Sequence, residues 1–413
     1  MTDVSRSSGV LLHVTSLPSG RLDDDAYRFV DWLLEAGQSW WQVLPIHIPD
    51  TLGSPYASRS AFAGHEGLLA PPGSSHHDDG LGSAGAPEGC WLPEWIEFAG
   101  ASERRAQTRF QREWRALRAY ANERGIRLIG DIPLYVSGDA CDAVTHPHLF
   151  DRSVVAGAAP SLNHPEGQRW GMPVFDWPVH AADSFAWWLE RIARELELFD
   201  LIRLDHFRGL VQFWQLPPDE TDPSRGSWGT GPGIALFDAI RKRFSSLPLI
   251  LEDLGRITPD VVELREQLGV PGMNVVARVA DIDWRTDSVI YTSTHDSDPL
   301  MGWWQRWGRE NQPHLAAGAT SPADEHHALL RHVLETENDL VILPAQDLLG
   351  LGSEARMNRP GTVDSRNWRW HLERPLTSDD AARLRELTDA AGRVGAPRST
   401  RADPVRLGSG SER

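Results

Sequence analysis

The feature of the sequence that most constrains the fold is a repeated alternation of short apolar runs with longer amphipathic segments. The apolar runs have the length of strands and are bounded by turn residues. Segments between them, such as 185–199, repeat apolar residues at intervals of three and four, as a helix with one buried face does. Strands that alternate with helices pair in parallel, and eight such units favour a closed (β/α)8 TIM barrel of the α/β class over an open sheet. The eight predicted strands are residues 9–14, 41–46, 127–135, 201–207, 248–254, 273–279, 288–294 and 339–345.

Two stretches interrupt this alternation and predict long insertions. One lies at about 47–100, after the second strand, and the other at about 146–180, after the third. Barrels place their binding loops at the C-terminal ends of strands, so both insertions are expected to border a site. We predict a single catalytic barrel domain over residues 1–393, followed by a disordered tail over 394–413, where Gly, Pro, Ser, Arg and Asp dominate.

Composition excludes several classes of partner. The net charge of −17 and the lack of a long basic run argue against nucleic acid. No apolar run approaches the roughly 20 residues that span a bilayer, so no membrane partner is expected. Cys90 and Cys141 have neither metal-ligand nor paired spacing, which indicates a reducing compartment. We expect a cytoplasmic protein that is a monomer or a weak homodimer.

Four of the predicted strands bring an acidic side chain to their C-terminal ends, which form the catalytic face of a TIM barrel. A lone acid there is usually a cap or an ion-pair partner, but acids that recur at the same end of several strands indicate a site. Arg203 precedes Asp205 by two positions on one strand, so both side chains point to the same side and the guanidinium keeps the carboxylate ionised. The four acids are Asp131, Asp205, Glu252 and Asp296.

Two chemistries use such a ring of carboxylates: metal-assisted proton abstraction and retaining glycoside cleavage. Arg203 favours the second, because a fixed positive charge beside Asp205 opposes a bound cation. In that interpretation Asp205 is the nucleophile and Glu252 is the acid/base, with their carboxyl groups about 5 to 5.5 Å apart. Asp296 binds sugar hydroxyls more tightly as charge builds on the ring, beside His295.

Three short segments carry these acids: Arg-Leu-Asp-His at 203–206, Leu-Glu-Asp-Leu-Gly at 251–255 and Thr-His-Asp at 294–296. Together with further segments they resemble the amylomaltases, the bacterial 4-α-glucanotransferases of glycoside hydrolase family 77, in the α-amylase clan. The further segments lie at 8–13, 54–56, 60–64, 130–133, 167–171 and 350–358, so the resemblance spans roughly residues 6 to 372.

This resemblance implies the transfer of α-1,4-glucan segments between maltodextrins by a retaining double displacement through a covalent glycosyl-enzyme intermediate. It implies a maltodextrin donor and acceptor, glucose as a further small partner, and neither a cofactor nor a metal. Asp205 is implied as nucleophile, Glu252 as acid/base and Asp296 as transition-state stabiliser. The implied sugar-binding residues are Tyr56, Asp131, Trp170, Arg203 and His295.

The chain also departs from the family pattern. It is short for the family, and its differences at Met172, His65 and Ala277 bear on the donor and acceptor subsites. Alternative functions therefore stay open: an α-glucoside hydrolase of the same clan, or a catalytically impaired glucan-binding or regulatory protein. A metal-dependent barrel is the remaining alternative.

Overall fold

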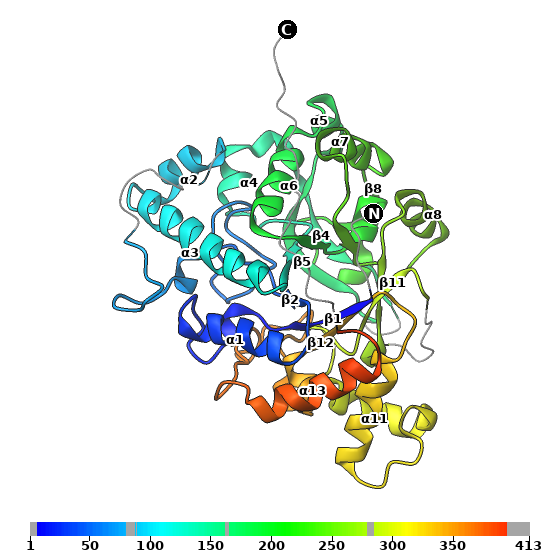
Figure 1. Cartoon of the computed structure of the whole chain (residues 1–413). Helices are drawn as coiled ribbons and strands as arrows, with labels where there is room; N and C mark the ends of the chain where they lie inside the picture. The colour runs from blue at the N-terminus through cyan, green and yellow to red at the C-terminus, as the bar shows by residue number, and fades with distance from the viewer. Residues whose placement is uncertain (1–5, 80–86, 88, 162–164, 279–284, 395–413) are drawn as a thin grey trace.

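The computed structural model describes residues 6–79, 87, 89–161, 165–278 and 285–394. Eight parallel strands form one sheet in the order β10-β11-β12-β1-β2-β3-β6-β9, which confirms the predicted TIM barrel (Figure 1). The first strand pairs with both the second and the last, so the sheet curls round on itself. The strands are β1 (Ser7–Leu11), β2 (Trp40–Gln42), β3 (Arg127–Ile132), β6 (Leu201–Leu204), β9 (Leu249–Leu251), β10 (Gly272–Val275), β11 (Ser288–Tyr291) and β12 (Leu340–Pro344).

Each strand overlaps its predicted run, but all eight predicted runs extend further in the C-terminal direction. After β2, for example, Val43, Leu44 and Ile46 remain buried although they no longer pair in the sheet. The apolar pattern reports burial, and at the rim of the barrel burial continues where strand pairing has ended. The predicted strand ends were wrong for this reason.

The seam of the barrel between β9 and β10 depends on a side chain. The backbone N–H of Leu251 donates to the carbonyl of Pro271 at 2.9 Å. The N–H of Met273 donates to Asp253 Oδ1 at 2.8 Å, so a carboxylate takes the place of a ladder hydrogen bond. Arg265 and Arg285 lie 3.4 Å and 3.2 Å from the other oxygen of Asp253 and compensate its buried charge.

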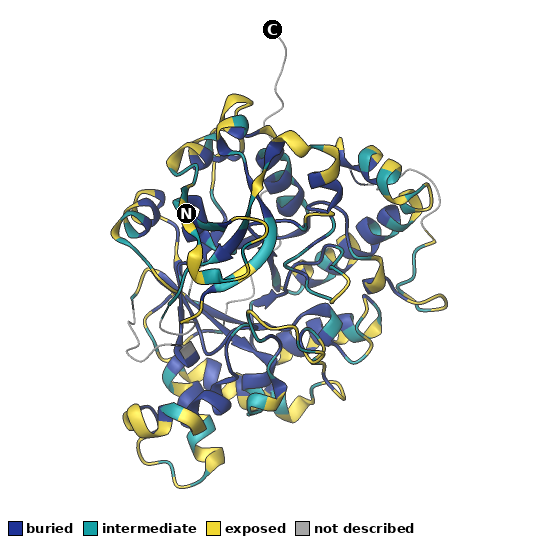
Figure 2. Ribbon diagram, turned by 180° about the vertical axis from the view of Figure 1, so that it is seen from behind, coloured by how far each residue is buried: buried dark blue, intermediate teal, exposed yellow. Residues whose placement is uncertain are grey.

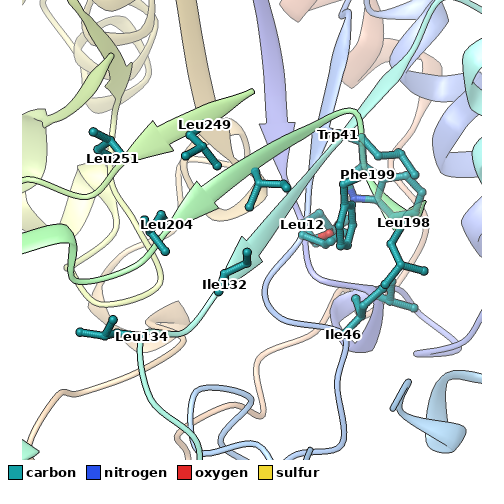
Figure 3. Close-up of a cluster of buried hydrophobic side chains, with 14 of the residues drawn as sticks. Leu12, Trp41, Ile46, Ile132, Leu134, Leu198, Phe199, Leu204, Leu249 and Leu251 are labelled. Atoms are coloured by element: carbon teal, nitrogen blue, oxygen red, sulfur yellow. Dashed lines mark hydrogen bonds between the residues drawn. The ribbon is translucent and has the colours of Figure 1, made fainter. Parts of the chain in front are cut away.

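The barrel strands pack apolar side chains on both faces, as parallel strands do. One set fills the inside of the barrel and includes Trp40, Ile129 and Ile250. Alternate residues of the same strands, such as Ile132 and Leu204, belong to a second cluster that also contains helix residues such as Trp114, and Figure 3 shows part of this cluster. Figure 2 shows buried residues at the centre and exposed residues on the outer faces of the helices.

The amphipathic segments form the expected helices. In α3, Phe110, Trp114 and Leu117 face the core while charged residues fill the opposite side. The segment predicted over 185–199 is α6. The helices are α1 (Asp24–Glu35), α2 (Trp91–Ala99), α3 (Glu103–Glu123), α4 (Cys141–Thr145), α5 (Trp177–Ala182), α6 (Ala186–Leu198), α7 (Ile234–Phe244), α8 (Pro259–Leu268), α9 (Leu300–Trp303), α10 (Arg309–Asn311), α11 (Pro322–Leu334), α12 (Ala345–Leu348) and α13 (Ser378–Ala390).

A second, antiparallel sheet was not predicted. Its strands are β4 (Phe150–Ala158), β5 (Gln168–Phe175), β7 (Gln212–Leu216) and β8 (Ser227–Thr230), in the order β5-β4-β7-β8. The first two lie in the predicted insertion at 146–180. The last two form a further excursion after β6, so the prediction of only two insertions was incomplete. Many residues of this sheet are half-buried or exposed, and its strands therefore lack a continuous apolar run.

Three other predictions concern the remaining segments. The insertion at 47–100 contains the helix α2, which its Gly- and Pro-rich surroundings concealed. Of the tail predicted over 394–413, all but Val394 lies outside the described residues. Among the described residues, no helix is both long enough and apolar enough to cross a bilayer.

Candidate active site

A cavity of about 800 Å³ lies where the barrel strands end and the antiparallel sheet begins. Its floor consists of residues that follow β6, β9 and β11, and its walls include β5, β7 and β8. Six of the eight predicted site residues line this cavity. These six are Tyr56, Trp170, Arg203, Asp205, Glu252 and Asp296.

The register of the barrel brings the predicted residues together. Asp131 on β3 lies directly opposite Arg203 on β6. The last registered pair of β6 and β9 is Leu204 with Leu251, and the next residue of each strand is Asp205 and Glu252. Because neighbouring strands lie about 4.8 Å apart, the two carboxylates leave the barrel side by side.

Arg203 holds the centre of the site. Its Nη1 donates to both carboxylate oxygens of Asp131 at 2.8 Å, and its Nη2 lies 2.9 Å from Asp205 Oδ1. Burial alone would lower the pKa of Arg203, but the Asp131 and Asp205 carboxylates outweigh burial and raise that pKa well above its usual value. The guanidinium therefore stays charged and fixes the orientation of Asp205.

Asp131 supports the site from below the cavity. Burial raises the pKa of Asp131 above its ordinary value, although the charge of Arg203 opposes this shift. Its Oδ2 also accepts a hydrogen bond from the Tyr56 hydroxyl at 2.7 Å. Tyr56 in turn stacks on His295, with ring centroids 4.7 Å apart. Asp131 and His295 are both buried, and neither occurs among the described residues that line the cavity.

Glu252 is tied to the chain segment that follows Asp205. The backbone N–H of His206 donates to Glu252 Oε2 at 2.9 Å, and the N–H of Phe207 donates to the Glu252 carbonyl at 3.1 Å. His206 has a left-handed backbone with φ 50° and ψ 46°, which is uncommon and unfavourable for a residue other than glycine. This turn presents its N–H to Glu252.

The imidazole of His206 is neutral and packs against an aromatic residue. Burial lowers the pKa of His206 to about 4, so the ring carries no charge near neutral pH. The ring contacts Trp170 edge to face, with centroids 4.8 Å apart. Trp170, which belongs to β5, thereby lies beside the chain segment that carries Asp205.

Asp296 is held by a loop that follows β12. Its Oδ1 accepts from Asn358 Nδ2 at 2.7 Å, and its backbone carbonyl accepts from Arg356 Nη2 at 2.5 Å. His295 Nε2 lies 3.4 Å from the same Oδ1 atom. Asn358 and Arg356 belong to the segment 350–358, which is part of the family resemblance. The sequence assigned no role to either residue.

A further aromatic residue at the site has no signal in the sequence. Trp368 lines the cavity, and its ring lies 5.6 Å from that of Tyr56 and 6.0 Å from that of His295. It occupies an irregular loop with a φ of 65°, where no periodic pattern exists to indicate burial or exposure. Only the tertiary fold places it beside Tyr56.

The three departures from the family pattern lie in different places. Met172 lines the active cavity. His65 lines a separate cavity of about 550 Å³, together with Trp95 and Phe98. Ala277 is buried and does not occur among the described residues that line either cavity. Within the described part of the chain, no group of three or more His, Cys, Asp or Glu side chains is arranged to hold a metal ion.

Comparisons with known proteins agree on one family. The model for glycoside hydrolase family 77, described as 4-alpha-glucanotransferase, matches residues 12–85 and 99–377. A 4-alpha-glucanotransferase of Aquifex aeolicus is 34% identical over 470 positions, covering 90% of this chain and 96% of the relative. One of Thermus thermophilus is 32% identical, covering 95% and 100%. The structure of an amylomaltase from Streptococcus agalactiae in complex with acarbose matches with a TM-score of 0.84 and 28% identity, covering 94% of this chain and 99% of that one.

The length of the alignment shows that this chain is shorter than its relative. The alignment with the Aquifex relative has 470 positions, whereas this chain has 413 residues, so the relative has residues where this chain has gaps. The expectation of a short member with trimmed loops is confirmed. On the family model, the relatives and the fold together, this chain belongs to glycoside hydrolase family 77, the 4-α-glucanotransferases.

Proposed function

We propose that the chain performs its 4-α-glucanotransferase activity as a retaining double displacement, with Asp205 as nucleophile and Glu252 as acid/base. The observation that carries this proposal is the ion pair between Arg203 and Asp205 at the floor of the cavity, 2.9 Å long, beside Glu252 on the adjoining strand. A nucleophilic carboxylate must be ionised and correctly aimed, and Arg203 supports both. The separation of about 5 to 5.5 Å between the two carboxyl groups stays a prediction.

The first step transfers a glucan segment to the enzyme. A carboxylate oxygen of Asp205 attacks the anomeric carbon, the glycosidic bond breaks, and the proton of Glu252 moves to the leaving oxygen. Glu252 Oε2 already accepts the N–H of His206, so the acidic proton lies on Oε1. In the second step the 4-hydroxyl of an acceptor glucan gives its proton to Glu252 and attacks the same carbon, which releases Asp205.

The other predicted residues support the charged transition state and bind the sugar. Asp296, oriented by Asn358, accepts hydroxyl groups of the reacting ring as positive charge builds on it. Tyr56 and Trp170 offer aromatic faces at the cavity wall, and sugar rings stack on such faces. Asp131 and His295 also hold Tyr56, Arg203 and Asp296 in position, and their direct contact with the sugar stays a prediction.

The substrates in this proposal are α-1,4-glucans, as donor and as acceptor, with glucose among the products and acceptors. The cavity of about 800 Å³ has room for several sugar units, and acarbose is the ligand of the matching Streptococcus agalactiae structure. We also propose a cytoplasmic location, which the two free cysteines support. The assembly as a monomer or a weak homodimer stays a prediction.

The experiment that tests the function is incubation with maltotriose alone, followed by chromatography and a count of reducing ends. Transfer is expected to give glucose together with a ladder of maltotetraose and longer chains, while the number of reducing ends stays constant. A hydrolase would give glucose and maltose with rising reducing ends. A protein that binds maltotriose without forming either set of products would support the glucan-binding alternative.

The backbone of His206 gives a prediction for the pH dependence. A β-branched residue disfavours the left-handed conformation, so His206→Val is expected to turn the N–H away from Glu252 Oε2. A carboxyl group without that donor holds its proton more tightly, and the alkaline limb of kcat/KM should move upward by about one pH unit. Asn tolerates this conformation, so His206→Asn should keep the wild-type limb. If His206→Val and His206→Asn showed the same alkaline limb of kcat/KM, the assignment of Glu252 as the acid/base would be contradicted.

A further inference from the structure

An exposed tryptophan on the antiparallel sheet lines the same cavity as the three carboxylates. Trp228 on β8 has 37% of its surface exposed, and it is the only aromatic residue among the large apolar side chains exposed in the described part of the chain. It lies directly opposite Trp214 of β7, which also lines the cavity. An aromatic ring that is partly exposed in the cavity wall offers a flat apolar surface on which a sugar ring can stack.

The indole of Trp228 is held in place on two sides. Trp214 contacts it edge to face with centroids 5.1 Å apart, and Trp214 Nε1 is itself fixed to the carbonyl of Pro223 at 2.9 Å. The guanidinium of Arg208 lies over the Trp228 ring at 4.2 Å, and its Nη1 donates to the Arg256 carbonyl at 2.5 Å. A ring that is already immobile loses little conformational entropy when a ligand binds.

Trp228 lies across the antiparallel sheet from the tryptophan that adjoins the nucleophile. Trp170 lies on β5 and contacts His206, next to Asp205, whereas Trp228 lies on β8 at the opposite edge of the same sheet. Three strand-to-strand steps separate β5 from β8, which corresponds to about 14 Å. A glucan that reaches from one tryptophan to the other must therefore contain several glucose units.

We propose that Trp228 forms a remote subsite that stacks on a glucose unit of an α-1,4-glucan bound across the antiparallel sheet. The apolar C–H face of the pyranose ring packs against the exposed part of the indole, which Trp214 and Arg208 hold in place. This subsite makes the enzyme favour long chains over short ones. The inference rests on the proposed function, because it takes the cavity to be the glucan site.

The test compares kcat/KM for maltoheptaose and maltotriose in the wild type and in Trp228→Ala. The ratio of the two values is expected to fall about tenfold in the variant, because only the longer substrate reaches this ring. Trp228→Phe, which keeps an aromatic face, should recover most of the ratio. Ile234→Ala is the matched control: Ile234 is also 37% exposed, follows β8 and does not occur among the cavity-lining residues described.

The proposal would be overturned if Trp228→Ala kept the wild-type ratio of kcat/KM for maltoheptaose to kcat/KM for maltotriose. It would also be overturned if the variant kept wild-type thermal stability and lost kcat/KM equally on both substrates. A second measurement separates this result from the proposed mechanism. Calorimetry of maltoheptaose binding to Asp205→Asn, with and without Trp228→Ala, should show an about tenfold weaker affinity in the double variant. If the wild type forms no ladder from maltotriose, the proposed function fails, whatever the binding result.

Discussion

Transfer between maltodextrins is expected to fall by at least about a thousandfold when Asp205 is replaced by Asn, because an amide cannot form the glycosyl ester. The substitution keeps the size of the side chain, removes its charge and replaces one carboxylate oxygen with an NH2 group. The measurement is the initial rate of ladder formation from maltotriose. Mass spectrometry of the quenched protein should find a glycosyl adduct in the wild type and none in Asp205→Asn.

The structure predicts that this variant stays folded. Arg203 keeps its two hydrogen bonds to Asp131 at 2.8 Å, so no buried charge is left without a partner. The midpoint of thermal unfolding should therefore stay close to that of the wild type. Asp219→Asn, at an exposed position between β7 and β8, is the matched control and should keep full activity. Asp205→Asn with most of the wild-type rate would show that another residue is the nucleophile.

The barrel and its acidic rim were predictable because they follow from local sequence. Parallel strands buried on both faces give continuous apolar runs, and all eight runs were found. An acid near the C-terminal end of four of these runs marks the C-terminal face of the barrel, so the sequence alone predicts that Asp205, Glu252 and Asp296 lie near one another. Their roles came from the resemblance and from the two-residue spacing of Arg203 and Asp205.

The parts that could not be predicted depend on contacts between distant segments. The strands of the antiparallel sheet border a cavity, so their apolar and polar residues follow no simple period, and β7 and β8 were missed. The support of Asp296 by Asn358 joins residues 62 positions apart in the chain. Trp368 reaches the cavity from a loop, and Trp228 reaches it from an edge strand. Their exposure depends on which distant segments pack against them.

The seam at β9 and β10 shows how one such contact serves the site. Asp253 accepts the N–H of Met273, and Met273 Sδ lies 3.3 Å from Arg203 Nε. Glu252 and Asp253 are adjacent, so the same strand end carries the proposed acid on one side and closes the barrel on the other. The position of Glu252 is therefore fixed by the closure of the barrel and by the N–H groups of His206 and Phe207.

Glu252→Gln is expected to lower transfer from maltotriose by about a hundredfold to ten-thousandfold, because the leaving oxygen no longer receives a proton. A donor that needs no proton separates this role from a general loss of structure. With α-maltosyl fluoride, fluoride leaves unaided, so the variant should still release fluoride in a first turnover. The second step still lacks its base, and the glycosyl adduct on Asp205 should accumulate and be visible by mass spectrometry.

The two variants then give opposite results with the same donor. Asp205→Asn loses the release of fluoride, whereas Glu252→Gln keeps the first release and traps the adduct. Glu266→Gln, at an exposed position on α8, is the control for the loss of a carboxylate as such. If Glu252→Gln released no fluoride while remaining folded, Glu252 would be needed for orienting the donor and not for proton transfer. The contact of Oε2 with the His206 N–H argues for proton transfer, because it fixes the carboxyl group and directs Oε1 to carry the acidic proton.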